Sequence, residues 1–140
     1  MQNVSVFLAQ HYLMTLAISG ILIILMGIEL LRLKKRRFRL SPSQVTQFIN
    51  KDQAVVIDIR SNAAYRQGHI IHAASISNHE LQTQPKKLDK YKTRPIIIVC
   101  ENGVESQKIA DRLTQSGYQC YSLAGGLRSW LDANMPLIKE

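Results

Sequence analysis

The sequence predicts an α/β fold, in which a parallel sheet is flanked by helices and preceded by one N-terminal transmembrane helix. Apolar, β-branched runs at residues 54–59 and 96–99 have the composition of buried strands, and segments with helical periodicity alternate with them. Residues 12–31 carry a single charge, Glu29, and are long enough to cross a bilayer as a helix. We therefore expect a membrane anchor followed by one small domain.

Basic residues follow the apolar stretch and set its expected orientation. Six of the 18 Lys and Arg residues lie between residues 32 and 39, whereas residues 1–11 contain none. A signal peptide has its positive charges before the apolar segment, so this pattern favours a retained anchor with its C-terminal side in the cytoplasm. The predicted segments are a short extracytoplasmic N-terminus at 1–11, a transmembrane helix at 12–31, a basic juxtamembrane linker at 32–40 and a domain at 41–140.

Composition excludes several kinds of partner and cofactor. Beyond Leu40 there are 12 basic and nine acidic residues, a net charge of +3 that gives no reason to expect nucleic acid as a partner. The basic linker suits the anionic head groups of membrane lipids instead. His72 and His79 lack a third ligand at suitable spacing, so we expect no metal site, and no motif indicates a cofactor. Two cysteines are too few for a disulfide framework.

The domain alternates helix and strand signals in chain order. Ser41, Pro42 and Gln44 form a helix start, with a capping hydroxyl, proline in the first turn and glutamine three residues after the cap. This helix is expected to run to about Asn50. Then follow a strand at 54–59, a short helix between Ser61 and Gly68, a weak strand at 74–77, short helices at 78–91 interrupted at Pro85, the strand at 96–99, a helix from about Glu105 that ends at Gly117, a strand at 119–123 and a helix at 127–133.

Cys100 lies where the strand at 96–99 ends and the next helix is about to begin. Ligand sites in α/β sheets lie at the carboxyl ends of strands, where backbone N–H groups and a helix dipole stabilise an anion. A thiolate is such an anion, so we expect Cys100 to be a nucleophile, with a buried structural cysteine as the alternative. Cys120 is expected to be a core residue, with a resolving thiol as its alternative.

Residues 41–138 resemble the rhodanese-like domains. The resemblance is carried by VVIDIR at 55–60, YRQGHI at 65–70, IIIVCENGVES at 96–106 and LAGGLRSW at 123–130. Each motif is weak alone, but their order and spacing are specific. The resemblance implies a parallel sheet, a persulfide carried on the catalytic residue Cys100, and a substrate-binding loop of Glu101, Asn102, Gly103, Val104, Glu105 and Ser106. With its N-terminal span, the chain is similar to single-domain rhodaneses anchored in the bacterial inner membrane, with the domain cytoplasmic.

Other positions in these motifs have structural expectations. Asp58 and Arg60 are predicted to form an ion pair or hydrogen-bond network, and His69 to be a packing and hydrogen-bonding residue. Gly125 and Gly126 are predicted to form a turn, and this turn borders the active site in the family that the chain resembles.

Two residues of the loop have predicted roles of their own. Gly103 is expected to permit a tight backbone that brings amides close to a ligand. Ser106 either caps the helix or donates a hydrogen bond to the sulfur, and we favour capping.

The glutamates of the loop leave the function open. Glu101 and Glu105 disfavour both an oxyanion substrate such as thiosulfate and the thiolate itself. They also have a structural explanation, because acids are stabilising near a helix N-terminus. The first function that fits is a membrane-anchored sulfurtransferase or persulfide carrier, which takes sulfur from a small donor and gives it to a small or protein thiol. The second is a non-catalytic interaction module that binds membrane protein partners.

Overall fold

The structure, a computed structural model, describes residues 2–36 and 38–140. These residues form two compact units that divide between residues 37 and 38. The first unit contains two helices, α1 (Gln2–Gln10) and α2 (Tyr12–Arg36). From Tyr12 to Lys34, α2 is long and apolar enough to cross a membrane. The predicted apolar helix is therefore confirmed.

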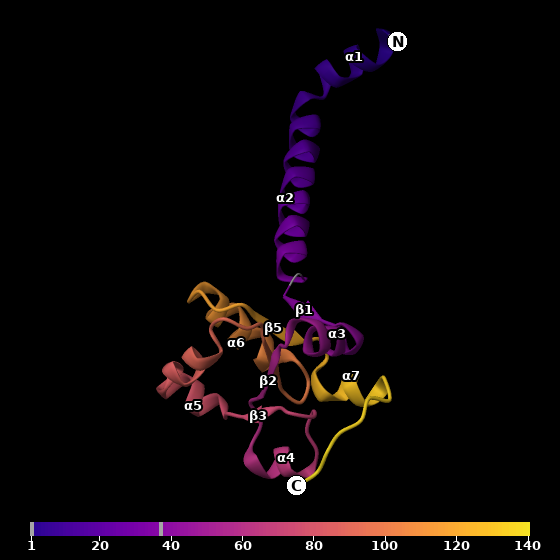
Figure 1. The fold of residues 1–140 in the computed structure, drawn as a ribbon. Coiled ribbons are helices and arrows are strands. Elements are labelled where there is room, and N and C mark those ends of the chain that lie inside the picture. The colour runs from indigo at the N-terminus through magenta and orange to yellow at the C-terminus, as the bar shows by residue number, and fades with distance from the viewer. Residues whose placement is uncertain (1, 37) are drawn as a thin grey trace. The chain divides into compact units, whose positions relative to one another are not determined.

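The second unit is built on a five-stranded parallel sheet with the strand order β1-β5-β4-β2-β3 (Figure 1). Paired neighbours all run parallel, with Val56 opposite Ile97 and Ile97 opposite Tyr121. The strands therefore end at the same edge of the sheet, which is where ligand sites form in such folds. The strands are β1 (Arg39–Leu40), β2 (Val55–Asp58), β3 (Ala74–Ser75), β4 (Ile96–Val99) and β5 (Cys120–Leu123).

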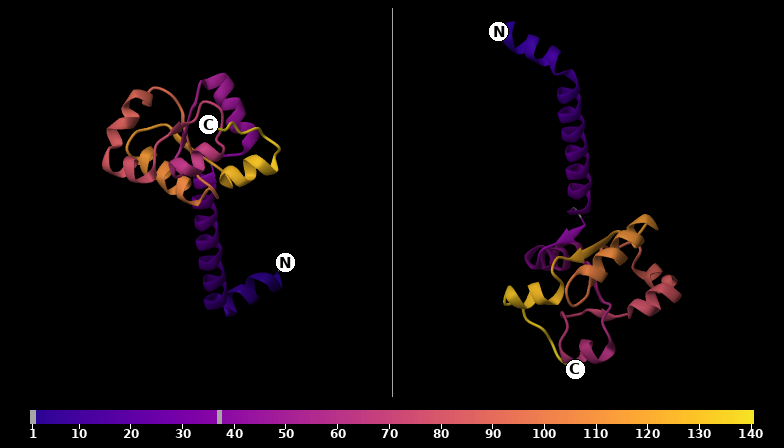
Figure 2. Two further views of the ribbon diagram at one scale, coloured as in Figure 1. Left: turned by 90° about the horizontal axis from the view of Figure 1, so that it is seen from below. Right: turned by 180° about the vertical axis from the view of Figure 1, so that it is seen from behind.

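Helices cover both faces of this sheet, as the views from two further directions also show (Figure 2). The central strands are consequently apolar on both faces, which is the pattern of buried parallel strands. One face carries α3 (Pro42–Asp52), α4 (Asn62–Gln67) and α7 (Gly126–Asp132), and the other carries α5 (Asn78–Thr83), the 3-10 helix η1 (Pro85–Tyr91) and α6 (Val104–Gln115).

Alternate residues of the central strand β4 pack into two separate cores. Ile96 and Ile98 pack with Ile109 of α6 on one face, whereas Ile97 packs with Trp130 of α7 on the other. All four residues of β4 are fully buried. Burial of one such isoleucine stabilises the fold by about 1.5–3 kcal/mol, so β4 contributes strongly to the stability of the domain.

The predicted helix start at Ser41 is confirmed. Ser41 Oγ accepts a hydrogen bond from the Gln44 N–H at 3.4 Å, and Gln44 Oε1 accepts one from the Ser41 N–H at 2.9 Å. Ser77 and Glu80 form a second capping box at the start of α5, which we did not predict. The Lys87 ammonium, 2.8 Å from Glu80, and the hydrogen bonds from Ser77 lower the pKa of this carboxyl to about 2.

Strand β1 departs from our prediction, which treated residues 32–40 as a linker. Leu40 O accepts a hydrogen bond from the Ala124 N–H at 2.8 Å, and Phe38 O accepts one from the Ser122 N–H at 2.8 Å. The Leu40 side chain is buried against the second core. A segment of two residues is too short to show the alternating pattern of a strand. It becomes a strand because the edge of β5 offers free backbone groups with which it can pair.

A fragment that begins at Phe38 should therefore be more stable than one that begins at Ser41. Removing residues 38–40 breaks the backbone hydrogen bonds that Ser122 and Ala124 donate to this segment and exposes the core beneath Leu40. The free energy of unfolding should fall by about 3 kcal/mol. Urea denaturation of the two fragments measures this difference, and identical midpoints with identical slopes would show that β1 adds nothing to stability.

Candidate active site

Cys100 follows β4 directly and is buried at the carboxyl edge of the sheet. Three groups converge on its Sγ atom: the Gly103 N–H at 3.1 Å, the Ser106 N–H at 3.4 Å and Ser106 Oγ at 3.3 Å. Ser106 lies in the first turn of α6, so the positive end of the helix dipole is directed at the sulfur. Donors arranged in this way stabilise negative charge, and the site can hold a reactive thiolate.

Ser106 does not cap α6, so the role that we favoured for it is wrong. The N-cap is Gly103, which makes no side-chain capping bond, and the helix begins at Val104. Ser106 therefore falls inside the first turn, where its side chain is fully buried and contacts Cys100. Its hydroxyl can accept a hydrogen bond from the thiol and donate one to the thiolate.

Close backbone packing between the loop and the start of α7 shapes the site. Gly103 has a φ of +83°, and a Cβ there would lie 2.8 Å from Gly125 N. A Cβ on Gly126 would lie 2.5 Å from Cys100 O. The first amides of α7 hold the loop in return, because the Leu127 N–H donates to Cys100 O at 3.0 Å. The predicted Gly125-Gly126 turn thus packs directly against the cysteine loop.

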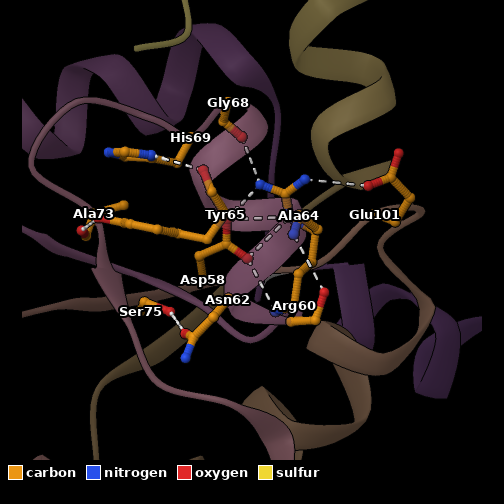
Figure 3. Close-up of polar contacts among 11 residues, drawn as sticks. Asp58, Arg60, Asn62, Ala64, Tyr65, Gly68, His69, Ala73, Ser75 and Glu101 are labelled. Atoms are coloured by element: carbon orange, nitrogen blue, oxygen red, sulfur yellow. Dashed lines mark hydrogen bonds and ion pairs between the residues drawn. The ribbon is translucent and has the colours of Figure 1, made fainter. Parts of the chain in front are cut away.

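The Arg60 guanidinium joins three segments at this edge of the sheet (Figure 3). Its Nε lies 3.0 Å from Asp58 Oδ1, its Nη2 lies 2.7 Å from Asp58 Oδ2 and 2.7 Å from Gly68 O, and its Nη1 lies 3.4 Å from Glu101 Oε2. Burial by itself lowers the pKa of Arg60, but the hydrogen bond and charge of Asp58, with those of Glu101, raise the pKa overall. The predicted pair of Asp58 and Arg60 is therefore present, with an unpredicted link to the loop.

A cleft of about 410 Å³ opens over Cys100 and is lined by side chains of both charges. Glu101 and Glu105 lie on its walls, as the sequence led us to expect, but they are accompanied by Arg60 and Lys108. We did not single out Lys108, although its position three residues after Glu105 on a helix was a usable signal. The complete lining is Ile59, Arg60, Cys100, Glu101, Asn102, Val104, Glu105 and Lys108.

Asn102 and Val104 shape the outer part of the loop. Asn102 Oδ1 accepts a hydrogen bond from the Val104 N–H at 3.2 Å and lies 3.9 Å from Cys100 Sγ. The Val104 side chain points outward and is 53% exposed. The mouth of the cleft therefore has an apolar rim beside its charged walls.

His69 and Cys120 are buried away from this cleft. The His69 ring stacks on Tyr65 with 3.7 Å between ring centroids, and its Nδ1 lies 2.9 Å from Tyr65 O, so the predicted packing role is confirmed. Burial raises the pKa of Cys120 to about 12, which favours the core interpretation over a resolving thiol. In the part of the chain that the structure describes, no three His, Cys, Asp or Glu side chains come close enough to hold a metal ion.

Comparison with known proteins gives this site a family context. The sequence-family model for the rhodanese-like domain matches residues 41–133. The chain is 28% identical over 141 residues to the uncharacterized protein YibN of Escherichia coli strain K12, covering 99% of each chain. It is 33% identical over 96 residues to the thiosulfate sulfurtransferase GlpE of Shewanella oneidensis, covering 68% of this chain and 93% of GlpE.

A solved structure supports the same assignment at the level of the fold. The crystal structure of a rhodanese-related protein from Thermoplasma volcanium matches with a TM-score of 0.67 at 22% identity, over 73% of this chain and 98% of that protein. This likeness confirms the predicted parallel sheet with flanking helices. Together, the match to the family model and the similarity to GlpE show that the chain belongs to the family of proteins with a rhodanese-like domain.

Proposed function

We propose that the chain is a membrane-anchored sulfurtransferase or persulfide carrier in which Cys100 is the nucleophile. The observation that carries this proposal is the convergence of the Gly103 N–H, the Ser106 N–H and the Ser106 hydroxyl on one sulfur atom. A cysteine that only fills the core needs no such set of donors. Similarity to the thiosulfate sulfurtransferase GlpE supports sulfur transfer as the class of reaction.

Sulfur transfer takes place in two half-reactions, each of which exchanges one S–S bond for another. The Cys100 thiolate attacks the outer sulfur of the donor, the S–S bond of the donor breaks, and the leaving group departs with the electron pair. With thiosulfate that leaving group is sulfite. An acceptor thiolate then attacks the outer sulfur of the Cys100 persulfide, and Cys100 leaves as a thiolate. Neither half-reaction needs an oxidant or a reductant.

The loop amides act at both ends of this cycle. The N–H groups of Gly103 and Ser106 hold negative charge on Sγ before the first attack and again when Cys100 leaves in the second. Between these steps the charge lies on the outer sulfur of the persulfide, about 2 Å farther along the S–S bond. The Arg60 and Lys108 side chains line the cleft into which that sulfur extends.

The charges of the cleft bear on the choice of donor. Glu101 contacts Arg60, which also pairs with the buried Asp58, so Arg60 offsets only part of the negative charge of Glu101. Among the described residues, Glu105 has no cation within ion-pair distance. Its carboxylate disfavours a dianion such as thiosulfate and is more compatible with a less highly charged persulfide donor. We therefore infer that thiosulfate is a poor donor for this protein.

We also propose that α2 holds the domain at the bacterial inner membrane as a single span, with the domain in the cytoplasm. The support is the basic stretch 32–39 after the apolar segment and the absence of Lys and Arg from residues 1–11. The alignment with YibN extends over the apolar segment as well as the domain. The proposed limits remain 1–11 for the outer segment and 12–31 for the span, whereas the linker is shortened and the domain begins at Phe38, because β1 pairs with β5.

An interaction module that binds membrane protein partners is the second candidate. The exposed Val104 side chain and the Glu105 carboxylate at the mouth of the cleft favour it, because they suit a protein surface better than an oxyanion. The two candidates differ in whether Cys100 ever carries sulfur, which can be measured directly.

Replacing Cys100 with serine should abolish persulfide formation and lower sulfur transfer by about a thousandfold or more, since a hydroxyl is a much weaker nucleophile than a thiolate. Mass spectrometry after incubation with thiosulfate or glutathione persulfide detects the bound sulfur. Cys120→Ala is the matched control and should retain both persulfide and turnover. A wild-type chain that carries no persulfide from either donor would instead favour the interaction module.

Replacing Glu105 with arginine should raise kcat/KM for thiosulfate about tenfold, because the change removes a repulsion and adds an attraction at a partly exposed site. Glu105→Gln should give an intermediate value. Alkylation of Cys100 at neutral pH should also become faster. Asp52→Arg makes the same change in charge at the end of α3 and should alter neither rate. If Glu105→Arg and Glu105→Gln both have the thiosulfate turnover and alkylation rate of the wild type, the charge of the loop does not limit the use of thiosulfate.

The topology predicts that protease added outside intact spheroplasts leaves residues 41–140 uncut, because all six charges of the basic stretch stay in the cytoplasm. The same protease should digest the domain once the spheroplasts are lysed. Immunoblotting of a C-terminal tag follows both reactions. Loss of the tag from intact spheroplasts would place the domain on the other side of the membrane.

A further inference from the structure

Exposed cations gather at the amino end of the sheet, the edge opposite the Cys100 cleft. Because the strands are parallel, the segments that lead into β2, β4 and β5 come together there. Lys90, Lys92 and Arg94 precede β4, and all three are exposed. These three residues form what we call the amino-end surface.

Contacts between the leading segments hold this surface in place. Arg94 Nε donates a hydrogen bond to Gln53 O, just ahead of β2, at 2.7 Å. Tyr118, just ahead of β5, donates its hydroxyl hydrogen to Asp89 Oδ1 at 2.5 Å, and the Lys92 ammonium lies 5.7 Å from the Tyr118 ring centroid. The cations therefore project from the end of η1 and the loop after it, which are bonded to the segments ahead of β2 and β5.

The charge of the amino-end surface is one-sided. Ahead of β2, Lys51 and Asp52 offset each other. Asp89 is the only acidic residue between residues 85 and 95, and its carboxylate accepts the Tyr118 hydroxyl. At the opposite edge, the cleft over Cys100 is lined by both cations and carboxylates. An extended anionic surface is therefore attracted to the amino end of the sheet and meets mixed charge at the other end.

The geometry points to anionic lipid head groups as the partner of the amino-end surface. This inference rests on the proposed anchoring by α2, which confines the domain near a leaflet rich in anionic lipid. Contact through Lys90, Lys92 and Arg94 turns the opposite edge of the sheet, with Cys100, away from the bilayer. The cleft is then open to donors and acceptors in the cytosol.

The test uses the full chain in nanodiscs of phosphatidylcholine, with and without phosphatidylglycerol, and follows lysine acylation by mass spectrometry. Lys90 and Lys92 should be acylated about threefold more slowly in the anionic discs, whereas Lys108 at the cleft should react equally in both. Roughly 1 M salt should remove the difference, because it shortens the Debye length to about 3 Å.

Charge reversal separates lipid contact from other causes of protection. Lys92→Glu should weaken the protection of Lys90, whereas Lys139→Glu, the same change in the C-terminal segment, should not. Circular dichroism confirms that both variants are folded. Equal acylation of Lys90 in the two kinds of disc, with the chain inserted in both, would overturn the lipid contact and leave the anchor intact. A chain that enters neither disc would overturn the anchor and this inference together.

Discussion

The burial of β4 between β2 and β5 is the constraint on which the active site depends. All four residues from Ile96 to Val99 are fully buried, and they alternate between two cores. The backbone ladders with β2 and β5, in which Val56 lies opposite Ile97 and Ile97 lies opposite Tyr121, set the register of the strand. Cys100, as the next residue, is thereby held at the carboxyl edge of the sheet. The position of Cys100 follows from the packing of the strand before it.

Two glycines then decide what surrounds the sulfur. Gly103 and Gly125 each adopt a left-handed conformation directly before a helix, so α6 and α7 both begin beside Cys100. The absence of side chains at Gly103 and Gly126 lets the two backbones approach. The N–H groups of Gly103 and Ser106 then point at Sγ, while amides of α7 hold the loop carbonyls. These donors are in place before any substrate arrives, which is the condition under which electrostatic stabilisation is effective.

Arg60 connects this arrangement to the rest of the sheet edge. Its guanidinium is mostly buried and pairs with Asp58, whose carboxylate is also buried, so the loss of either partner would leave an uncompensated charge. The remaining Nη1 group faces Glu101, and this makes the two loop glutamates unlike one another. Glu101 belongs to a charge network, whereas Glu105 lines the cleft outside that network. The choice between the two proposed functions therefore centres on Glu105.

The sequence by itself determined the features that depend on neighbours within a few residues. These are the apolar helix, the bounds of β4, the capping box at Ser41 and the place of Cys100 at a strand end, because periodicity and capping are local properties. Only the tertiary structure decided the pairing of β1 with β5, the contact of Ser106 with the sulfur and the link from Arg60 to Glu101. Each of these joins groups whose separation or orientation is set by the folded sheet: an edge strand needs a partner that exists only after folding, and a side chain six residues away reaches the sulfur only once the loop has closed.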